Sequence, residues 1–94
     1  GNNASRDYDL ESFHKDVIGF GRQSDCDIIL KSSFVSRLHG CFYLEKNEWH
    51  INDLNSTNGI IFNNNKIRQM VLSEYRFEIY KMEAPDDKVI ISVE

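Results

Sequence analysis

The stretch Ser36-Arg37-Leu38-His39-Gly40 begins fourteen residues after Gly21-Arg22 and is followed by Asn55-Ser56-Thr57-Asn58-Gly59. Each of these three polar clusters adjoins a stretch of alternating apolar residues, which is the pattern of loops that join β-strands. Together the clusters contain two guanidinium groups, hydroxyls and a carboxamide. These are the groups that a site needs in order to hold a phosphate and the backbone of the chain that carries it.

Apolar residues recur with a period of two, and no helix-length window has a stripe with a period of 3.6. The alternation is clear in residues 18–20, 40–44 and 49–51, with Asn47-Glu48 predicted as a hairpin turn between the last two. Asn63-Asn64-Asn65 is a strong turn signal because asparagine tolerates a positive φ. Short strands at about ten-residue spacing predict an all-β sandwich in two sheets.

The last third of the chain continues the pattern less clearly. Residues 75–79 and 89–93 alternate, with Ala84-Pro85-Asp86-Asp87 predicted as the turn between them. Residues 67–73 are compatible with a loop or with a short strand. Trp49 is predicted to belong to the core, and Asp53 is predicted to cap loop N–H groups at a strand end.

The length of 94 residues corresponds to one domain, and an apolar content of 40% is sufficient for one compact core. No run approaches 18 apolar residues, so we expect no membrane contact by this domain. The chain opens on Gly1 and a polar stretch instead of Met. We therefore expect residues 1–7 to be a flexible tail or a processing remnant and residues 8–94 to be the domain, a monomeric module of a longer protein.

The net charge of −4 argues against a nucleic-acid partner, which would require a basic stripe. Arg22, Lys31 and Arg37 nevertheless form a small cationic region, which suits a small anionic ligand. Cys26 and Cys41 do not make a disulfide scaffold, so we expect reduced thiols and a cytoplasmic protein, with a single bridge between them left open.

Each cluster has a simpler explanation when it is taken alone. Arg22 then reads as a surface arginine at a strand end, and Ser36 as a turn serine that bonds its own backbone. Asn58-Gly59 reads as a hairpin pair with positive φ. We expect His39 to be structural, with a partly buried imidazole that bonds loop carbonyls and holds Ser36 in place.

The order and spacing of the three clusters resemble the forkhead-associated (FHA) domain. The resemblance rests on Gly21-Arg22, Ser36-Arg37-Leu38-His39 and Ser56-Thr57-Asn58-Gly59, and it extends to residues 27–30 and 49–54 between them. It covers about residues 17–67. It implies a β-sandwich of about eleven strands that binds phosphothreonine peptides through loops at one end. The three histidines, His14, His39 and His50, show no metal-ligand spacing, and we expect no catalysis, cofactor or metal.

The resemblance also implies roles for individual residues. Arg22 and Ser36 would bind the phosphate, with Arg37 as a second contact. Thr57 and Asn58 would hold the peptide backbone around the phosphothreonine. The remaining matched positions would shape the loops; they are Gly21, His39 and Gly59.

The sequence departs from the family pattern at two turns. Ile60 stands where the family usually has threonine, and Asn64 stands where it often has glycine. Phe34 and Val35 precede Ser36, in the loop where family members often contact residues C-terminal to the phosphothreonine. We therefore expect a less charged specificity pocket here.

Two alternatives belong to other functional classes. An enzyme could use Ser36, His39 and Asp53 as nucleophile, base and orienting acid, although the chain has no nucleophile-elbow pattern. A phospho-independent interaction domain could use the same fold and bind its partner through a sheet face. The presence of Arg22, Ser36 and Asn58 favours phosphate binding over that alternative.

Overall fold

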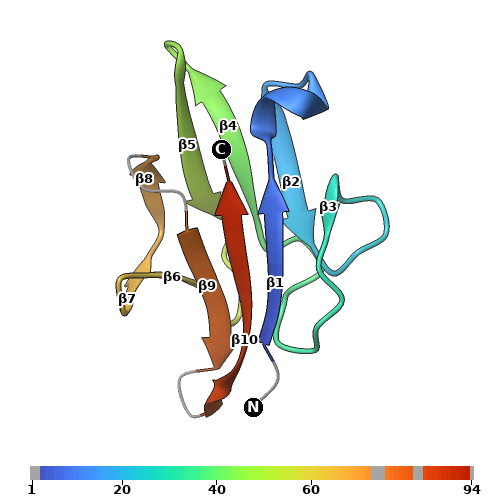
Figure 1. The fold of residues 1–94 in the computed structure, drawn as a ribbon, viewed down its shortest axis with the longest axis vertical. Coiled ribbons are helices and arrows are strands. Elements are labelled where there is room, and N and C mark those ends of the chain that lie inside the picture. Colours follow the sequence, from blue (N-terminus) through green and yellow to red (C-terminus); the bar gives the residue numbers. More distant parts are fainter. Residues whose placement is uncertain (1–2, 73–75, 82–83, 94) are drawn as a thin grey trace.

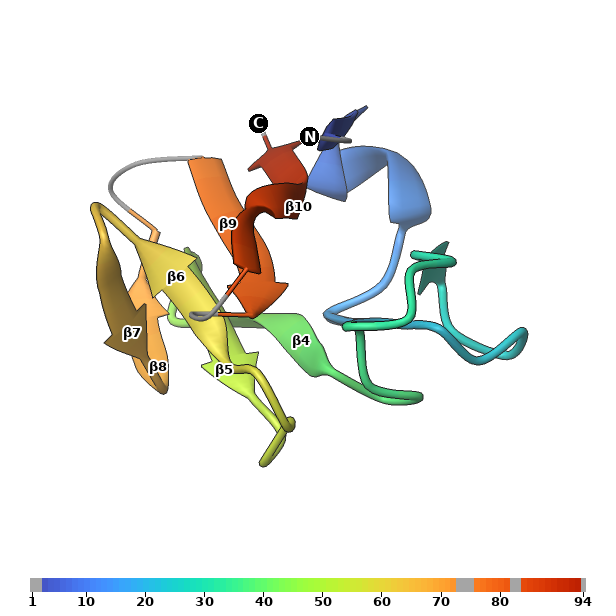
Figure 2. The same cartoon turned by 90° about the horizontal axis from the view of Figure 1, so that it is seen from below.

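The computed structural model describes residues 3–72, 76–81 and 84–93. In this part of the chain ten strands form two five-stranded sheets, which appear as two layers in Figure 2. The first sheet has the order β1 (Asn3–Tyr8), β10 (Ala84–Val93), β9 (Arg76–Lys81), β6 (Ile60–Phe62), β7 (Asn65–Ile67). The second has the order β3 (Ile28–Ile29), β2 (Val17–Gly21), β4 (Gly40–Glu45), β5 (Glu48–Asp53), β8 (Gln69–Val71).

The alternating residues of both sheets meet in one core, as the period of two predicted. Phe20 and Phe42 from the second sheet pack with their ring centroids 5.2 Å apart, and Phe42 lies 6.4 Å from Phe77 of the first sheet. Trp49 packs against this core, and its Nε1–H donates to Oε1 of Glu11 (3.0 Å) in the short 3₁₀ helix η1 (Leu10–Phe13). The predicted all-β sandwich is confirmed. No helix in the described residues is long and apolar enough to cross a membrane.

Two predicted turns form where residues with positive φ occur. The β4–β5 hairpin turns at Lys46 (φ 52°) and Asn47 (φ 63°), one residue earlier than predicted. The β6–β7 hairpin turns at Asn63 (φ 49°) and Asn64 (φ 65°). Asparagine tolerates this left-handed region because its short amide bonds the nearby backbone.

The later strands differ from the prediction in two places. Residues 84–87, predicted as a turn, belong to β10, and the register with β9 shifts between Ala84 and Lys88. This irregularity absorbs the extra residues, as a β-bulge does. The ambiguous segment 67–73 contains the end of β7 and the strand β8. Tyr75 and Ser73 lie outside the described residues.

The N-terminal segment takes part in the first sheet. Residues 3–8 form β1, which pairs in parallel with β10 from Asn3 opposite Lys88 to Tyr8 opposite Val93. We expected residues 1–7 to be a flexible tail or a processing remnant, because the chain opens on Gly1 and a polar stretch instead of Met. Backbone hydrogen bonds to a neighbouring strand do not require an apolar face, so the pattern did not predict this pairing.

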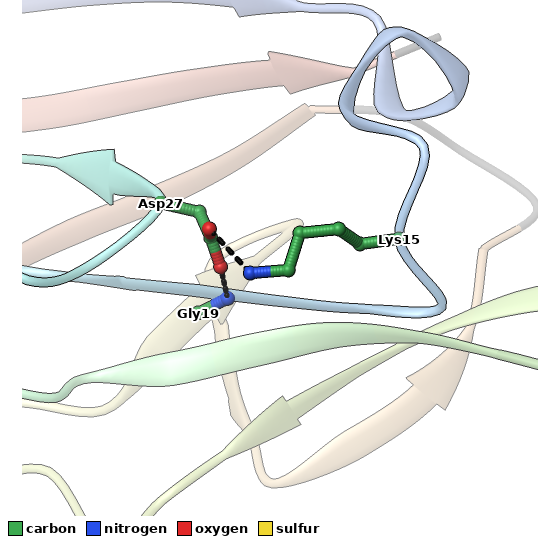
Figure 3. A network of polar contacts seen from close by, with 3 residues as sticks. All are labelled: Lys15, Gly19 and Asp27. Carbon is green, nitrogen blue, oxygen red and sulfur yellow. Dashed lines mark hydrogen bonds and ion pairs between the residues drawn. The ribbon is translucent and has the colours of Figure 1, made fainter.

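A charged network holds the start of β3 against β2, as Figure 3 shows. Asp27 accepts a hydrogen bond from Nζ of Lys15 (2.7 Å) and another from the backbone N–H of Gly19 (3.0 Å). The Lys15 ammonium, together with the Gly19 N–H, lowers the pKa of the Asp27 carboxyl against the opposing effect of burial. The network anchors one end of the loop of residues 22–27, which begins with Arg22.

The strand order brings the three polar clusters to one end of the sandwich. Because β2, β4 and β5 are antiparallel neighbours, the end of β2, the start of β4 and the end of β5 lie together. The β4–β5 hairpin lies at the opposite end, at the top of Figure 1. Residues 54–59 then cross from the second sheet to β6 in the first.

Candidate functional site

The end of β2 runs against the loop that precedes β4. The backbone N–H of Arg22 donates to the carbonyl of Ser36 (3.0 Å), and that of Gln23 donates to the carbonyl of Arg37 (3.0 Å). A Cβ atom at Gly21 would lie 2.2 Å from the Arg37 carbonyl oxygen. Since that neighbour is backbone and cannot move aside, glycine is required for the close approach that brings Arg22 beside Ser36.

The side chain of Arg22 is exposed and is oriented by one bond. Its Nε–H donates to the carbonyl of Val35 (3.0 Å). In the described part of the chain, its terminal N–H groups have no hydrogen-bond partner, and no carboxylate lies within ion-pair distance. A guanidinium held in this way can offer a planar fork of donors to an anion.

Ser36 connects two of the loops through its hydroxyl. Its Oγ accepts a hydrogen bond from the backbone N–H of Thr57 (3.0 Å). Because the oxygen already accepts a bond, the hydroxyl proton remains for donation to a further acceptor. Ser36 therefore joins the loops and still has a donor to offer.

His39 is 0% exposed and is bonded at both ring nitrogens. The backbone N–H of Ser36 donates to Nδ1 (3.0 Å), so Nε2 carries the proton and donates it to the Gly59 carbonyl (2.7 Å). The His39 carbonyl also accepts from the N–H of Leu54 (3.0 Å). One buried imidazole thus joins the loop before β4 to the loop after β5.

Burial lowers the pKa of His39 below its usual value. The hydrogen bond to Gly59 and the nearby carboxylate of Asp53 oppose this shift. The neutral ring also fits the contacts, because a proton on Nδ1 would face the N–H of Ser36.

Asn58 reaches across to the loop before β4. Its Nδ2 donates to the carbonyl of Phe34 (2.7 Å). Among the described residues the second amide proton and the amide oxygen have no partner, and together they match the acceptor and donor of a peptide group.

The loop 54–59 is braced from within by Asp53 and Ser56. The N–H of Ser56 donates to Oδ2 of Asp53 (3.2 Å), and its hydroxyl donates to Oδ1. The N–H of Gly59 donates to Oγ of Ser56 (2.8 Å). Asp53 caps a loop N–H as predicted, and this bracing orients Thr57 and Asn58.

The three loops enclose an open groove of about 390 Å³, which we call the loop groove. It is lined by six of the residues singled out from sequence and by Ser33 of the loop before Ser36. The lining residues are Arg22, Ser33, Phe34, Val35, Ser36, Thr57 and Asn58. The groove therefore combines a cation, hydroxyls and an amide with an apolar wall.

The other predicted residues lie beneath or beside the groove. Gly21, His39 and Gly59 hold the loops through the backbone contacts described above. Arg37 is exposed but does not line the groove. Its carbonyl accepts from Gln23 and from Sγ of Cys26 (3.4 Å). In this structure Arg37 therefore supports the loops through its backbone carbonyl.

Sequence reasoning missed Ser33 and the carbonyls of Phe34 and Val35. Those carbonyls orient Asn58 and Arg22, and any residue type can supply a carbonyl, so no motif could reveal them. The position of Phe34 and Val35 in the loop before Ser36 was the signal that pointed to this segment.

Two simpler interpretations do not fit the geometry. Asn58-Gly59 is not a hairpin pair, because it lies in the crossover between sheets and only Gly59 (φ 76°) has a positive φ. A Ser36–His39–Asp53 triad is not assembled, since both ring nitrogens of His39 meet backbone groups and Asp53 bonds Ser56. Cys26 and Cys41 are free thiols, and burial raises the pKa of both.

Comparisons with known proteins agree with this architecture. Glycogen accumulation regulator GarA from Mycobacterium tuberculosis is 39% identical over 57 residues, which are 61% of this chain and 35% of GarA. The chain thus spans about a third of the length of the curated relatives it matches.

Solved structures show the same fold. The FHA-1 domain of M. tuberculosis Rv1747 superposes with a TM-score of 0.64 at 23% identity, over 69% of this chain and 67% of that one. M. tuberculosis EmbR, solved in complex with a low-affinity phosphopeptide, gives a TM-score of 0.62 at 30% identity, over 72% of this chain and 18% of EmbR. The sequence model of the FHA domain family matches residues 18–77, and the chain belongs to that family.

Proposed function

We propose that this chain is a phosphothreonine-peptide recognition module that mediates phosphorylation-dependent interactions between proteins, as part of a larger signalling protein. The observation that supports this most is the loop groove, where Arg22 and Ser36 lie side by side with donors that the described residues leave unused. The solved complex of EmbR with a phosphopeptide adds support from a related structure.

Arg22 and Ser36 would bind the phosphate. A phosphate group adds about −1.5 to −2 charges and three strong acceptor oxygens near neutral pH. The guanidinium of Arg22 can donate two parallel hydrogen bonds, and Ser36 can add its hydroxyl proton. Each bond to a charged group contributes about 1.5–3 kcal/mol, so the two residues can separate phosphorylated from unphosphorylated ligands.

Thr57 and Asn58 would hold the peptide backbone beside the phosphothreonine. The amide of Asn58 is already oriented by the Phe34 carbonyl, so binding would cost little side-chain entropy. Arg37 would be a second phosphate contact, which requires its exposed side chain to turn toward the groove.

The preference for threonine over serine would come from the γ-methyl group. One methyl in a fitted pocket changes binding by about 1–3 kcal/mol. Phe34 and Val35 supply an apolar wall in the same groove. We expect this wall to favour an apolar over an acidic residue at the third position after the phosphothreonine.

The proposal includes several properties of the partner and the setting. The partner is a Ser/Thr-phosphorylated protein or peptide, with no nucleic acid and no membrane contact by this domain. The chain acts as a monomer in the cytoplasm, without a cofactor and without catalysis. An acidic net charge of −4 fits a protein ligand better than a polyanion.

Isothermal titration with one peptide in three forms tests the proposal. The phosphothreonine form should bind with micromolar affinity, the phosphoserine form about 5- to 100-fold more weakly, and the unphosphorylated form not detectably. A second pair of phosphothreonine peptides, with leucine or aspartate at the third following position, tests the apolar wall. Equal binding with and without phosphate would support the phospho-independent alternative and overturn the proposal.

A further inference from the structure

Lys66 lies beside the loop groove although it comes from an edge strand of the first sheet. It is exposed and belongs to β7. Its Cγ, Cδ and Cε atoms each lie 2.9 Å from the position that a Cβ of Gly59 would occupy. The aliphatic stem of Lys66 therefore lies over Gly59, the residue that follows Asn58.

The strand register explains the direction of this stem. Lys66 pairs with Ile61 of β6, and Gly59 directly precedes that strand, two residues before Ile61. The side chain of Lys66 therefore extends diagonally across the strand pair, past its partner Ile61 and toward the loop of residues 54–59. Gly59 permits the crossing because it has no side chain. The ammonium group, one bond beyond Cε, consequently lies at the flank of that loop.

The position of Gly59 is also well determined. Its N–H donates to Ser56 and its carbonyl accepts from His39, so both of its polar groups are used. The side chain of Asn58 reaches toward Phe34 on the groove side. Lys66 approaches Gly59 on its Cβ side, so it extends the site past the groove.

The charge of Lys66 is not neutralised within the described residues. No carboxylate there lies within ion-pair distance of it, and Glu78, which pairs with Ile61 on β9, is engaged with Lys88 (3.1 Å). Asp53 at the other end of the loop is used by Ser56. The backbone carbonyl of Arg68, a second exposed cationic residue, accepts from the N–H of Asp53 (2.7 Å) at the start of this loop.

We infer that Lys66 is a specificity-determining residue that selects phosphopeptides with an acidic side chain on the flank that crosses Asn58 and Gly59. The inference rests on the proposed function, since it describes a second contact of the same ligand. Arg22 and Ser36 would hold the phosphate, and the ammonium of Lys66 would pair with a carboxylate several residues away along the peptide.

A purely structural role is the simpler alternative, in which the stem only covers Gly59. The two roles separate in Lys66→Met, because methionine keeps an unbranched apolar stem and removes the charge. Lys46→Met is the matched control, since Lys46 is also exposed but lies in the β4–β5 turn at the other end of the sandwich.

The test measures the affinity of three phosphothreonine peptides by titration. One has alanine on both flanks, one has two glutamates before the phosphothreonine, and one has two glutamates after it. For the wild type we expect at least one acidic peptide to bind about 2- to 5-fold more tightly than the alanine peptide at low salt, as for an exposed ion pair. Lys66→Met should lose this gain, and Lys46→Met should keep it.

Two results would overturn the inference while the proposed function stands. They are an absence of any gain from acidic flanks, or a gain that persists in Lys66→Met, with the alanine phosphopeptide still bound in either case. If the alanine phosphopeptide does not bind the wild type at all, the proposed function fails and this inference fails with it.

Discussion

The two ends of the sandwich are stabilised by different kinds of interaction. At one end the β4–β5 hairpin turns through Lys46 and Asn47, and the turn depends on the positive φ angles of these two adjacent residues. At the other end the loops around the groove are held by bonds between residues far apart in sequence. His39 bonds Gly59, twenty positions away, and Asn58 bonds Phe34, twenty-four positions away.

The difference shows where stability and binding are coupled. A change in the hairpin affects one local turn, and we expect it to leave the groove intact. A change in the buried bonds of the loop end removes support from several groove residues at once, because Ser36, Thr57 and Asn58 depend on the same contacts.

His39→Ala should have the largest effect on stability. It removes a fully buried ring and leaves the N–H of Ser36 and the carbonyl of Gly59 without partners. We expect a loss of about 3–5 kcal/mol in the free energy of unfolding, measured by urea denaturation. His50→Ala is the control, since His50 is half-buried and stacks on Tyr43 at 4.8 Å on the second sheet. His50→Ala should lower the free energy of unfolding by about 1 kcal/mol or less. Similar losses in both variants would contradict the role given to His39.

Acidic pH should have the second-largest effect, which is a loss of stability at the loop end. The folded pKa of His39 is lowered, so below about pH 6.5 the unfolded chain binds a proton that the folded chain resists. His39 therefore makes its full contribution to the free energy of unfolding above that pH. The contribution falls as the pH drops, by at most about 1.4 kcal/mol per pH unit. Urea denaturation at pH 7.5 and 5.5 measures the fall. In His39→Gln, which cannot titrate, the fall should be smaller; an equal fall would assign it to other groups.

Lys46→Gly should have the smallest effect and the opposite sign. A lysine in the left-handed region is strained, and glycine adopts that conformation freely. We expect the free energy of unfolding to rise by about 0.5–1 kcal/mol, with phosphopeptide affinity unchanged. Chemical denaturation and titration of the same sample measure both. A change in affinity would show that the two ends are coupled, which the structure does not predict.

The fold was largely predictable because its signals are local. Alternation marked β2, β4, β5 and β9, and the turn at Asn63-Asn64 followed from the tolerance of asparagine for positive φ. The pairing of β1 with β10 was not predictable, because parallel pairing between the two ends of the chain leaves no local pattern.

The candidate site was predictable as a set of residues but not as a geometry. Spacing singled out Arg22, Ser36 and Asn58, all of which line the groove. The spacing also singled out Arg37, which does not line the groove. The approach of Lys66 to Gly59 depends on strand register and on a missing Cβ, and the sequence contains no direct sign of either.

Titration of Arg22→Ala with a phosphothreonine peptide tests whether the loop groove binds phosphate through Arg22. Loss of two hydrogen bonds to a charged group, about 3–6 kcal/mol together, should reduce affinity more than 100-fold. Circular dichroism and urea denaturation should show a folded variant, because Arg22 is exposed. If a folded Arg22→Ala variant binds the phosphopeptide with unchanged affinity, Arg22 does not hold the phosphate and the loop groove is not the phosphate site proposed here.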